Sequence, residues 1–145
     1  MDIRLATHDD LPEIARALVA ASDEMEHKYG TARMDVTIMQ AIEHGVATDQ
    51  AVIVAFEGSV LVGWCAWVIL PGGPNGCAHG LGTWVRPGCR ELGISKKLRT
   101  LAAAKAKSCG ATHVVGTVDE GNAAGLRSSL AEGFDVIGTV VRKAL

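Results

Sequence analysis

Apolar residues along this chain alternate as in strands in some stretches and recur at helical spacing in others. Residues 3–6 alternate and predict a short first strand. Helical spacing follows over residues 11–22 and returns over residues 36–45, where Gly45 is expected to end the second helix. The polar stretch between them, residues 23–33, shows little periodicity and is expected to be a loop or a frayed helix end.

The middle of the chain carries the clearest β signal. Residues 51–56 and 60–70 are rich in apolar, β-branched and aromatic residues and flank a short glycine-containing turn, which predicts an antiparallel hairpin. Gly63, inside the second strand, indicates a bulge. A glycine- and proline-rich loop over residues 71–76 then leads into another strand at residues 77–85.

The last third of the chain predicts two helices and two strands. A helix begins near residue 94 and stops at Cys109-Gly110. The elements after it are a strand at 112–118, a helix at 122–132 and a strand at 136–141. The predicted order is β-α-α-β-β-β-α-β-α-β, which favours an α/β or α+β layered fold with a mixed sheet.

Composition narrows the class of protein. A length of 145 residues with 48% hydrophobic and 21% charged residues indicates one folded domain. The net charge of −2 gives no basic footprint for nucleic acid or an anionic membrane. The longest apolar stretch, residues 60–70, is too short to span a bilayer, and the first residues lack the pattern of a signal peptide. We therefore expect a cytoplasmic protein.

The four cysteines do not have the spacing of metal ligands. Cys65, Cys77, Cys89 and Cys109 form no C-x-x-C unit and no histidine pair accompanies them, so we expect no metal site. Disulfides are not expected in a cytosolic chain. No residue that could act as a general base lies at a characteristic spacing from Cys89, so we do not expect Cys89 to be a nucleophile.

Residues 85–98 have the pattern of a strand, a short loop and a helix. Gly93 stands where the loop meets the helix, whose first N–H groups are unpaired and lie at the positive end of the dipole, so an anion can bind there. A P-loop is excluded because Ile94 occupies the position of its lysine. The dinucleotide fingerprint that begins at residues 80–82 is excluded because Val85 occupies the position of its third glycine.

The same stretch resembles the pyrophosphate-binding motif of the GNAT superfamily of N-acetyltransferases. That motif has a valine, an arginine or glutamine, a glycine, a glycine or alanine, and a leucine at fixed spacing. These positions hold Val85, Arg90, Gly93, Ser95 and Leu98. Ser95 departs from the family pattern but is still small. The alternative is an ordinary strand–loop–helix junction with a capping glycine.

A second motif supports the resemblance. Asn122-x-x-Gly125, followed by Gly133-Phe134, is similar to the family's Asn-x-x-Ala helix that ends in Gly-Phe, with glycine in place of alanine. The order of elements also matches the family along the whole chain. The resemblance implies a mostly antiparallel central sheet flanked by helices. It further implies acetyl-CoA as acyl donor, without a metal, and direct attack by an acceptor amine of a small molecule or a protein.

The resemblance also implies where acetyl-CoA binds. The strand before the motif splays from the next one, and a backbone N–H of Thr83, Trp84 or Val85 would polarise the thioester carbonyl. Asn122 would contact the cofactor or simply cap its helix. The N–H groups expected to hold the pyrophosphate belong to Arg90, Glu91, Leu92, Gly93, Ile94, Ser95 and Lys96. The cations that would lie near the nucleotide phosphate, or form a solvated helix face, are Lys96, Lys97 and Arg99.

The expected general base is His79. Some family members place a catalytic glutamate eleven positions before the motif arginine, and His79 occupies that position here. A neutral imidazole suits proton removal from an ammonium near neutral pH. The alternative is a surface histidine beside a glycine-rich loop. The other candidate bases are Glu26, His27, Asp119 and Glu120.

The expected proton donor departs from the family. Many members carry a tyrosine seven positions after the motif asparagine, where this chain has Ser129. A serine hydroxyl is a poorer acid than a phenol. Ser129 therefore either orients a water that protonates the leaving thiolate, or plays no part and leaves that step to solvent.

Two other functions compete with acetyl transfer. The domain could bind acyl-CoA as a sensor or interaction module without efficient catalysis, or it could be an α/β binding domain unrelated to CoA. The acceptor amine is expected to be selected by residues 23–46 and 71–76. Pairing across an edge strand would give a homodimer.

Overall fold

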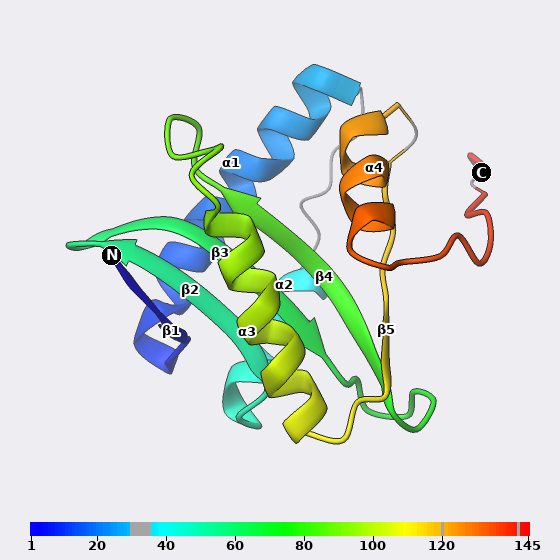
Figure 1. Ribbon diagram of the computed structural model, residues 1–145, viewed down its shortest axis with the longest axis horizontal. Coiled ribbons are helices and arrows are strands. Elements are labelled where there is room, and N and C mark those ends of the chain that lie inside the picture. Colours follow the sequence, from blue (N-terminus) through cyan, green and yellow to red (C-terminus); the bar gives the residue numbers. More distant parts are fainter. Residues whose placement is uncertain (30–35, 120, 142) are drawn as a thin grey trace.

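The β-rich middle of the sequence forms the centre of a five-stranded sheet with helices on both faces (Figure 1). The computed structural model describes residues 1–29, 36–119, 121–141 and 143–145, with side chains described outside residues 25–36. The elements are β1 (Asp2–Leu5), the short 3-10 turn η1 (His8–Asp10), α1 (Leu11–Tyr29), α2 (Val36–Ala47), β2 (Ala51–Glu57), β3 (Val60–Val68), β4 (Cys77–Val85), α3 (Ile94–Ser108), β5 (His113–Val115) and α4 (Ala123–Ala131). Within these ranges, no helix combines the length and the hydropathy that crossing a membrane requires.

The strands lie in the order β1-β2-β3-β4-β5. The first four are antiparallel to their neighbours, and β5 runs parallel to β4. In Figure 1, α3 crosses one face of the sheet, and α1 and α2 lie on the other. This mixed, mostly antiparallel sheet between helices confirms the predicted fold class.

The sheet is buried on both faces, which explains why β2 and β3 read as nearly continuous apolar runs. Beneath α1 and α2, Ile14, Leu18 and Ile42 pack against one face of the hairpin and against Trp64 and Trp84. Beneath α3, a second core packs on the other face. It is formed by Ile53, Val62, Cys65, Ala78, Val85, Ile94, Leu98, Ala102 and others.

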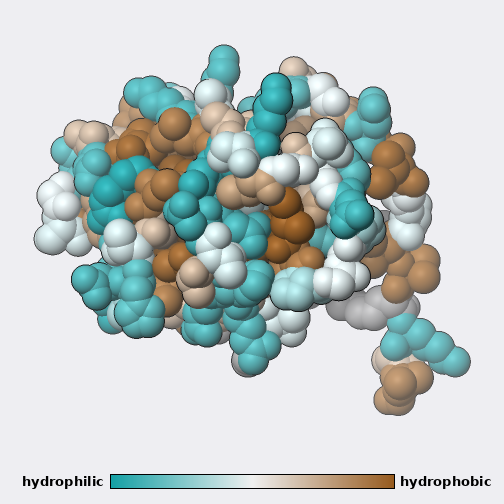
Figure 2. Space-filling model, turned by 90° about the horizontal axis from the view of Figure 1, so that it is seen from below, coloured by the Kyte–Doolittle hydropathy of each residue, from teal (hydrophilic) through white to brown (hydrophobic). Residues whose placement is uncertain are grey.

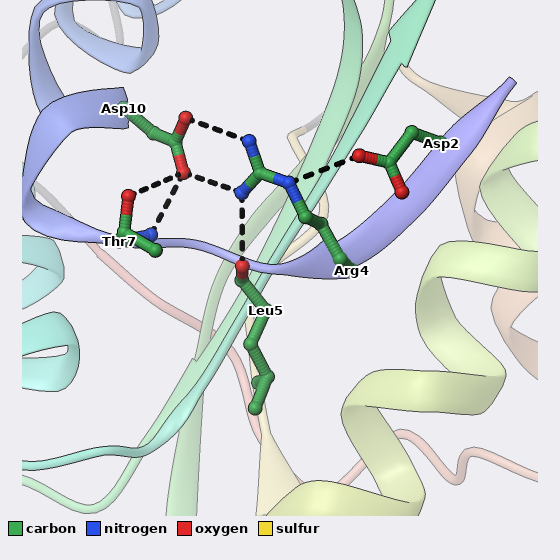
Figure 3. Close-up of polar contacts among 5 residues, drawn as sticks. All are labelled: Asp2, Arg4, Leu5, Thr7 and Asp10. Carbon is green, nitrogen blue, oxygen red and sulfur yellow. Dashed lines mark hydrogen bonds and ion pairs between the residues drawn. The ribbon is translucent and has the colours of Figure 1, made fainter.

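Arg4 and Asp10 join the first strand to the start of α1 (Figure 3). Two guanidinium nitrogens of Arg4 donate to the carboxylate oxygens of Asp10 at 2.7 and 3.1 Å. The same carboxylate accepts from the backbone N–H of Thr7 at 2.7 Å, which caps the turn η1. Asp10 is 7% exposed, and the hydrogen bond from Arg4 lowers the pKa of its carboxyl group.

Two glycines have roles different from those predicted. Gly45 does not end α2, which continues to Ala47. A Cβ on Gly45 would lie 2.7 Å from a methyl carbon of Val68, so the glycine lets the helix approach the sheet. Gly63 is not the bulged residue, because the register passes from Ala55↔Gly63 to Phe56↔Leu61 and leaves Val62 as the extra one. A Cβ on Gly63 would lie 3.0 Å from Leu98 of α3.

The helix α1 is longer than predicted. It continues to Tyr29, through most of the polar stretch that was expected to be a loop or a frayed end.

The C-terminal part of the chain is less packed than predicted. The strand β5 covers only His113–Val115, and residues 136–141 form no strand. Their apolar side chains stay exposed, with Ile137 82% and Val141 87% accessible. Figure 2 shows apolar surface on the chain end that projects from the body. β-branched residues alone do not make a strand when no neighbouring edge pairs with them.

Candidate functional site

The strands β4 and β5 diverge partway along their length. Their pairing ends at His79↔Val115, while β4 continues to Val85. Two glycines sit at the fork. A Cβ on Gly80 would lie 3.4 Å from the carbonyl oxygen of Val115, and one on Gly116 would lie 3.4 Å from that of Gly80. Beyond the fork, β4 has a side that β5 does not cover, which we term the open edge (residues 81–85).

The register of β4 determines which backbone groups face the open edge. Pairing with β3 passes from Trp67↔Gly80 to Ala66↔Gly82, so Leu81 is a bulged residue. The N–H of Arg86 donates to the carbonyl oxygen of Val62 at 2.8 Å. Hydrogen-bonded and non-bonded pairs alternate along an antiparallel ladder. The backbone groups of Trp84 therefore face β3, and those of Thr83 and Val85 face the open edge.

A tight loop leads from β4 to α3, and we term residues 86–93 the cradle loop. It begins with a turn in which the N–H of Cys89 donates to the carbonyl oxygen of Arg86 at 3.0 Å. Gly88 has φ +90°, so this turn follows the type II pattern with Pro87 and a glycine at its centre. Glu91 (φ 65°) and Gly93 (φ 77°) are also left-handed. Alternation of this kind turns successive N–H groups toward one side, as anion-binding backbone nests do.

The helix α3 begins at the end of the cradle loop without a side-chain cap. Its N-cap residue is Gly93, and the first turn contains no acidic residue. The first hydrogen bond from within the helix is donated by the N–H of Lys97 to the carbonyl of Gly93 at 3.2 Å. The N–H groups of Ile94, Ser95 and Lys96 thus lack helical acceptors and lie at the positive end of the dipole. Ile94 and Leu98, both buried, fix this end of the helix to the sheet.

Arg90 points away from the cradle toward α1. Its Nε donates to the carbonyl oxygen of Val85 at 2.8 Å. Its two terminal nitrogens donate to the carboxylate of Glu24 at 2.8 and 2.6 Å. Glu24 was not among the residues predicted for the site. It lies 66 positions from Arg90, in a polar stretch with no local signal for the contact.

The structure describes the side chains of two of the candidate bases. His79 is half-buried at the last paired position, on the face of α1 and α2 because its neighbour Ala78 packs beneath α3. Asp119 is half-buried after β5. The side chains of Glu26 and His27, and residue Glu120, lie outside the described part of the chain.

The second motif forms the start of α4. The Oδ1 of Asn122 accepts from the N–H of Gly125 at 3.0 Å and caps the helix. A Cβ on Gly125 would lie 2.5 Å from Nδ2 of Asn122, so an alanine here would require the Asn122 amide to shift. Ser129 donates its hydroxyl proton to the carbonyl oxygen of Gly125 at 3.0 Å. Arg99, one of the cations expected near the phosphates, is instead paired with Glu132.

All four cysteines are free. Cys65 lies in the core below α3, and burial raises the pKa of its thiol to about 12, so it is not a thiolate at neutral pH. Thr83 donates its hydroxyl to the sulfur of Cys65 at 3.3 Å, which fixes this side chain of the open edge. Cys89 is half-buried in the cradle loop and packs against the same core.

Other hollows and clusters among the described residues do not compete with this site. A hollow of about 510 Å³ lies between η1 and α2, lined by His8, Glu43 and others, and contains none of the predicted catalytic or CoA-binding residues. No group of three or more His, Cys, Asp and Glu side chains is placed to hold a metal ion within the described ranges. The fork, the open edge and the cradle loop therefore form the candidate site.

Solved structures share this fold along nearly the whole chain. A ribosomal-protein-alanine N-acetyltransferase from Brucella melitensis is 22% identical, over 95% of this chain and 86% of that chain, with a TM-score of 0.71. The PaiA N-acetyltransferase from Thermoplasma acidophilum, solved with coenzyme A, is 18% identical, over 96% and 92% of the two chains, with a TM-score of 0.70. An aminoglycoside N-acetyltransferase solved with CoA is 18% identical, over 99% and 98%, with a TM-score of 0.67.

At these identities, the solved structures establish a shared fold and not a shared substrate. A search of curated proteins gave no match. The model of the acetyltransferase (GNAT) family matches residues 14–127, which include the open edge, the cradle loop and the start of α4. The chain belongs to the acetyltransferase (GNAT) family.

Proposed function

We propose that this protein moves an acetyl group from acetyl-CoA to a primary amine, by direct attack of the amine in a ternary complex. The observation that carries the proposal is the open edge of β4 leading directly into the uncapped N-terminus of α3. The open edge supplies unpaired backbone groups for a polar chain, and the helix start supplies N–H groups for an anion. Membership of the family supports acetyl transfer in general.

In this proposal the cradle holds the pyrophosphate through backbone N–H groups from Arg90 to Lys96. Lys96 and Lys97 are exposed and supply positive charge nearby, whereas Arg99 is already paired with Glu132. Asn122 acts chiefly as a helix cap, because its Oδ1 accepts from Gly125.

The thioester carbonyl is proposed to accept from a backbone N–H on the open edge. Thr83 and Val85 are the candidates there, and Trp84 is set aside because its backbone groups face β3. The donor is held by the sheet before the reaction, so stabilising the developing oxyanion requires no reorganisation. The carbonyl oxygen of Val85 accepts from Arg90, which keeps an unfavourable acceptor away from that oxyanion.

His79 is proposed as the general base, acting through water. It lies four residues before Thr83, about 13 Å along the strand, which exceeds direct hydrogen-bond reach. The proton donor is proposed to be solvent rather than Ser129, whose hydroxyl proton is directed to Gly125.

The acceptor is proposed to be an amine of a small molecule, an amino acid or a protein. The solved relatives carry names with acceptors as different as an aminoglycoside and a ribosomal-protein alanine, so the shared fold does not select among them. We expect the acceptor to be chosen by residues 23–46 and 71–76.

The first test is binding of CoA, measured by thermal unfolding and calorimetry. CoA at about 100-fold over its Kd should stabilise the folded protein by roughly 2.7 kcal/mol, which is several degrees in Tm. Ser95→Glu should abolish this shift, because a carboxylate in the first turn competes with the pyrophosphate while remaining compatible with the helix dipole. Thr100→Glu, exposed later on the same helix, is the matched control and should keep the shift. Absence of any shift with the unmodified protein would overturn the proposal.

A second candidate function is a CoA-binding sensor with little catalysis. The bond from Ser129 to Gly125 favours it, because no phenol stands at the family position and the serine proton is already used. Release of free CoA thiol from acetyl-CoA, followed with a panel of amines, separates the two. Saturable binding without amine-dependent release would support the sensor.

A further inference from the structure

We propose that Glu24 is a positioning residue that holds the cradle loop in the shape that binds CoA, an inference that rests on the proposed CoA site. Glu24 lies in the second half of α1, on the opposite side of the sheet from α3. Its carboxylate receives two hydrogen bonds from Arg90 at 2.8 and 2.6 Å. The pair links α1 to the loop around the end of β4.

All three nitrogens of the Arg90 guanidinium donate hydrogen bonds in this arrangement. Nε is bound to the carbonyl oxygen of Val85, and the two terminal nitrogens are bound to Glu24. The side chain therefore holds the end of β4 at a fixed distance from α1, and it fixes the position of Arg90 in the middle of the cradle loop. Bidentate pairs of this kind restrict orientation as well as distance.

The loop needs such an anchor because its own backbone does not favour this shape. Glu91, the residue after Arg90, is left-handed with φ 65°, a conformation that side-chain-bearing residues disfavour. Gly88 and Gly93 are left-handed as well and gain freedom in any loosened state. The exposed fractions of the Arg90 and Glu24 side chains are 36% and 24%, so water screens the pair only in part.

Two roles for Arg90 predict opposite results when Glu24 loses its charge. If Arg90 binds phosphate directly, Glu24 competes for it, and Glu24→Gln tightens CoA binding. General electrostatics predicts the same sign, because the substitution removes a negative charge near an anionic ligand. If Glu24 positions the loop, the substitution weakens CoA binding despite that electrostatic gain. Weakened binding is the result that we expect.

The test compares Glu24→Gln with Asp23→Asn by calorimetry with CoA. Asp23 is exposed, adjacent in α1 and not a partner of Arg90, so its substitution removes the same charge without the contact. We expect Glu24→Gln to raise the Kd about 5- to 10-fold and Asp23→Asn to leave it unchanged or lower it. In turnover, Glu24→Gln should raise the KM for acetyl-CoA and leave kcat unchanged. An equal or lower Kd for Glu24→Gln would overturn the inference.

A double-mutant cycle assigns the effect to the pair. Arg90→Gln should weaken CoA binding, and adding Glu24→Gln to it should weaken binding no further, because the contact is already absent. Full additivity of the two effects would contradict the proposal. Glu24→Asp, which keeps the charge but shortens the reach, should give an intermediate Kd and serves if Glu24→Gln folds poorly.

A readout without ligand separates this inference from the proposed function. In the free protein, ¹⁵N relaxation should show higher mobility of the amides of residues 88–93 in Glu24→Gln than in Asp23→Asn. Equal mobility of these amides in the two variants would exclude the positioning role of Glu24, even if the protein binds CoA. Failure of the unmodified protein to bind CoA, with the loop loosened as expected, would instead overturn the proposed function and leave the anchor established.

Discussion

The hydroxyl of Ser129 donates to the carbonyl oxygen of Gly125, one turn earlier in α4, at 3.0 Å. The proton is therefore directed into the helix and not toward the open edge. We expect Ser129→Ala to change kcat by less than about threefold, since general acid catalysis contributes at least 10²-fold where it operates. Ser128→Ala, on the exposed neighbouring position, is the control. A drop of 10²-fold or more confined to Ser129→Ala would assign the acid role to this residue.

His79 stands at the fork where β5 leaves β4, and its role as base predicts a kinetic signature. We expect His79→Ala to lower kcat by roughly 10²-fold and to remove the acid limb of the pH–rate profile, because that limb reports protonation of the base. His113→Ala, an exposed histidine two residues before Val115, should leave both unchanged. An unaltered profile in His79→Ala would exclude it from the role.

Asp10 predicts how stability depends on pH. Arg4 lowers the pKa of Asp10 in the folded state, so the unfolded chain binds this proton more strongly. The stabilisation is complete above the unfolded carboxyl pKa, about 4, and is lost as the pH falls through the lower folded value. We expect Asp10→Asn to cost roughly 1–3 kcal/mol at pH 7 and to flatten the stability profile below pH 4.

The control for Asp10 is Asp2→Asn, which removes the other carboxylate that contacts Arg4. The Asp2 side chain is 65% exposed, compared with 9% for Asp10, so its loss should cost little. Urea unfolding between pH 2.5 and 7 measures both. Parallel profiles for the unmodified protein and Asp10→Asn would contradict the assignment.

Gly45 predicts an overpacking effect. Gly45→Ala would favour the helix by about 1 kcal/mol, but its Cβ would lie 2.7 Å from Val68 and 3.0 Å from Val52. We expect the strain to dominate, with a net loss of roughly 1–2 kcal/mol in urea unfolding. Gly138→Ala is the control, since nothing lies within 4 Å of a Cβ at that position. If Gly45→Ala stabilised the protein, Val52 and Val68 would have moved to make room for the added methyl group, which would contradict this prediction.

Thiol labelling tests the cradle loop directly. In the native protein at pH 8, Cys65 should resist alkylation, because burial raises its pKa to about 12, while half-buried Cys89 and Cys109 react. CoA should slow labelling of Cys89 in the cradle loop and leave Cys109, beyond the far end of α3, unaffected. Mass spectrometry of the labelled peptides gives both rates. Equal protection of the two cysteines would point to global stabilisation rather than a ligand at the loop.

The sequence predicted the elements that have their own local signals. The bounds of β4 agree, and the start of α3 after Gly93 agrees because that glycine marks locally the change from loop to helix. The later part of α1 was left open between a loop and a frayed helix end because it has no apolar period. The strand expected over residues 136–141 did not form, since a strand requires pairing with a neighbouring strand as well as suitable residues.

The site was predictable to the same extent. The cradle loop was visible through Pro87, Gly88 and Gly93, which punctuate the chain locally. The choice between Thr83, Trp84 and Val85 needed the bulge at Leu81, which arises from pairing with β3. The pairing of Arg90 with Glu24 could not be predicted from the sequence, because a contact between residues 66 positions apart produces no pattern in either segment alone.

The fork at Gly80 and Gly116 also has a consequence for aggregation of the protein without ligand. Beyond it, β4 presents backbone groups that β5 does not pair, and another chain's strand could pair with them. A bound pantetheine arm, with its own amide groups, would act as a surrogate strand and pair with these groups. CoA or acetyl-CoA would then protect the protein against aggregation, in addition to its role in the reaction. We expect the protein to aggregate more slowly, as followed by light scattering at a fixed temperature below its Tm, when it is stored with CoA.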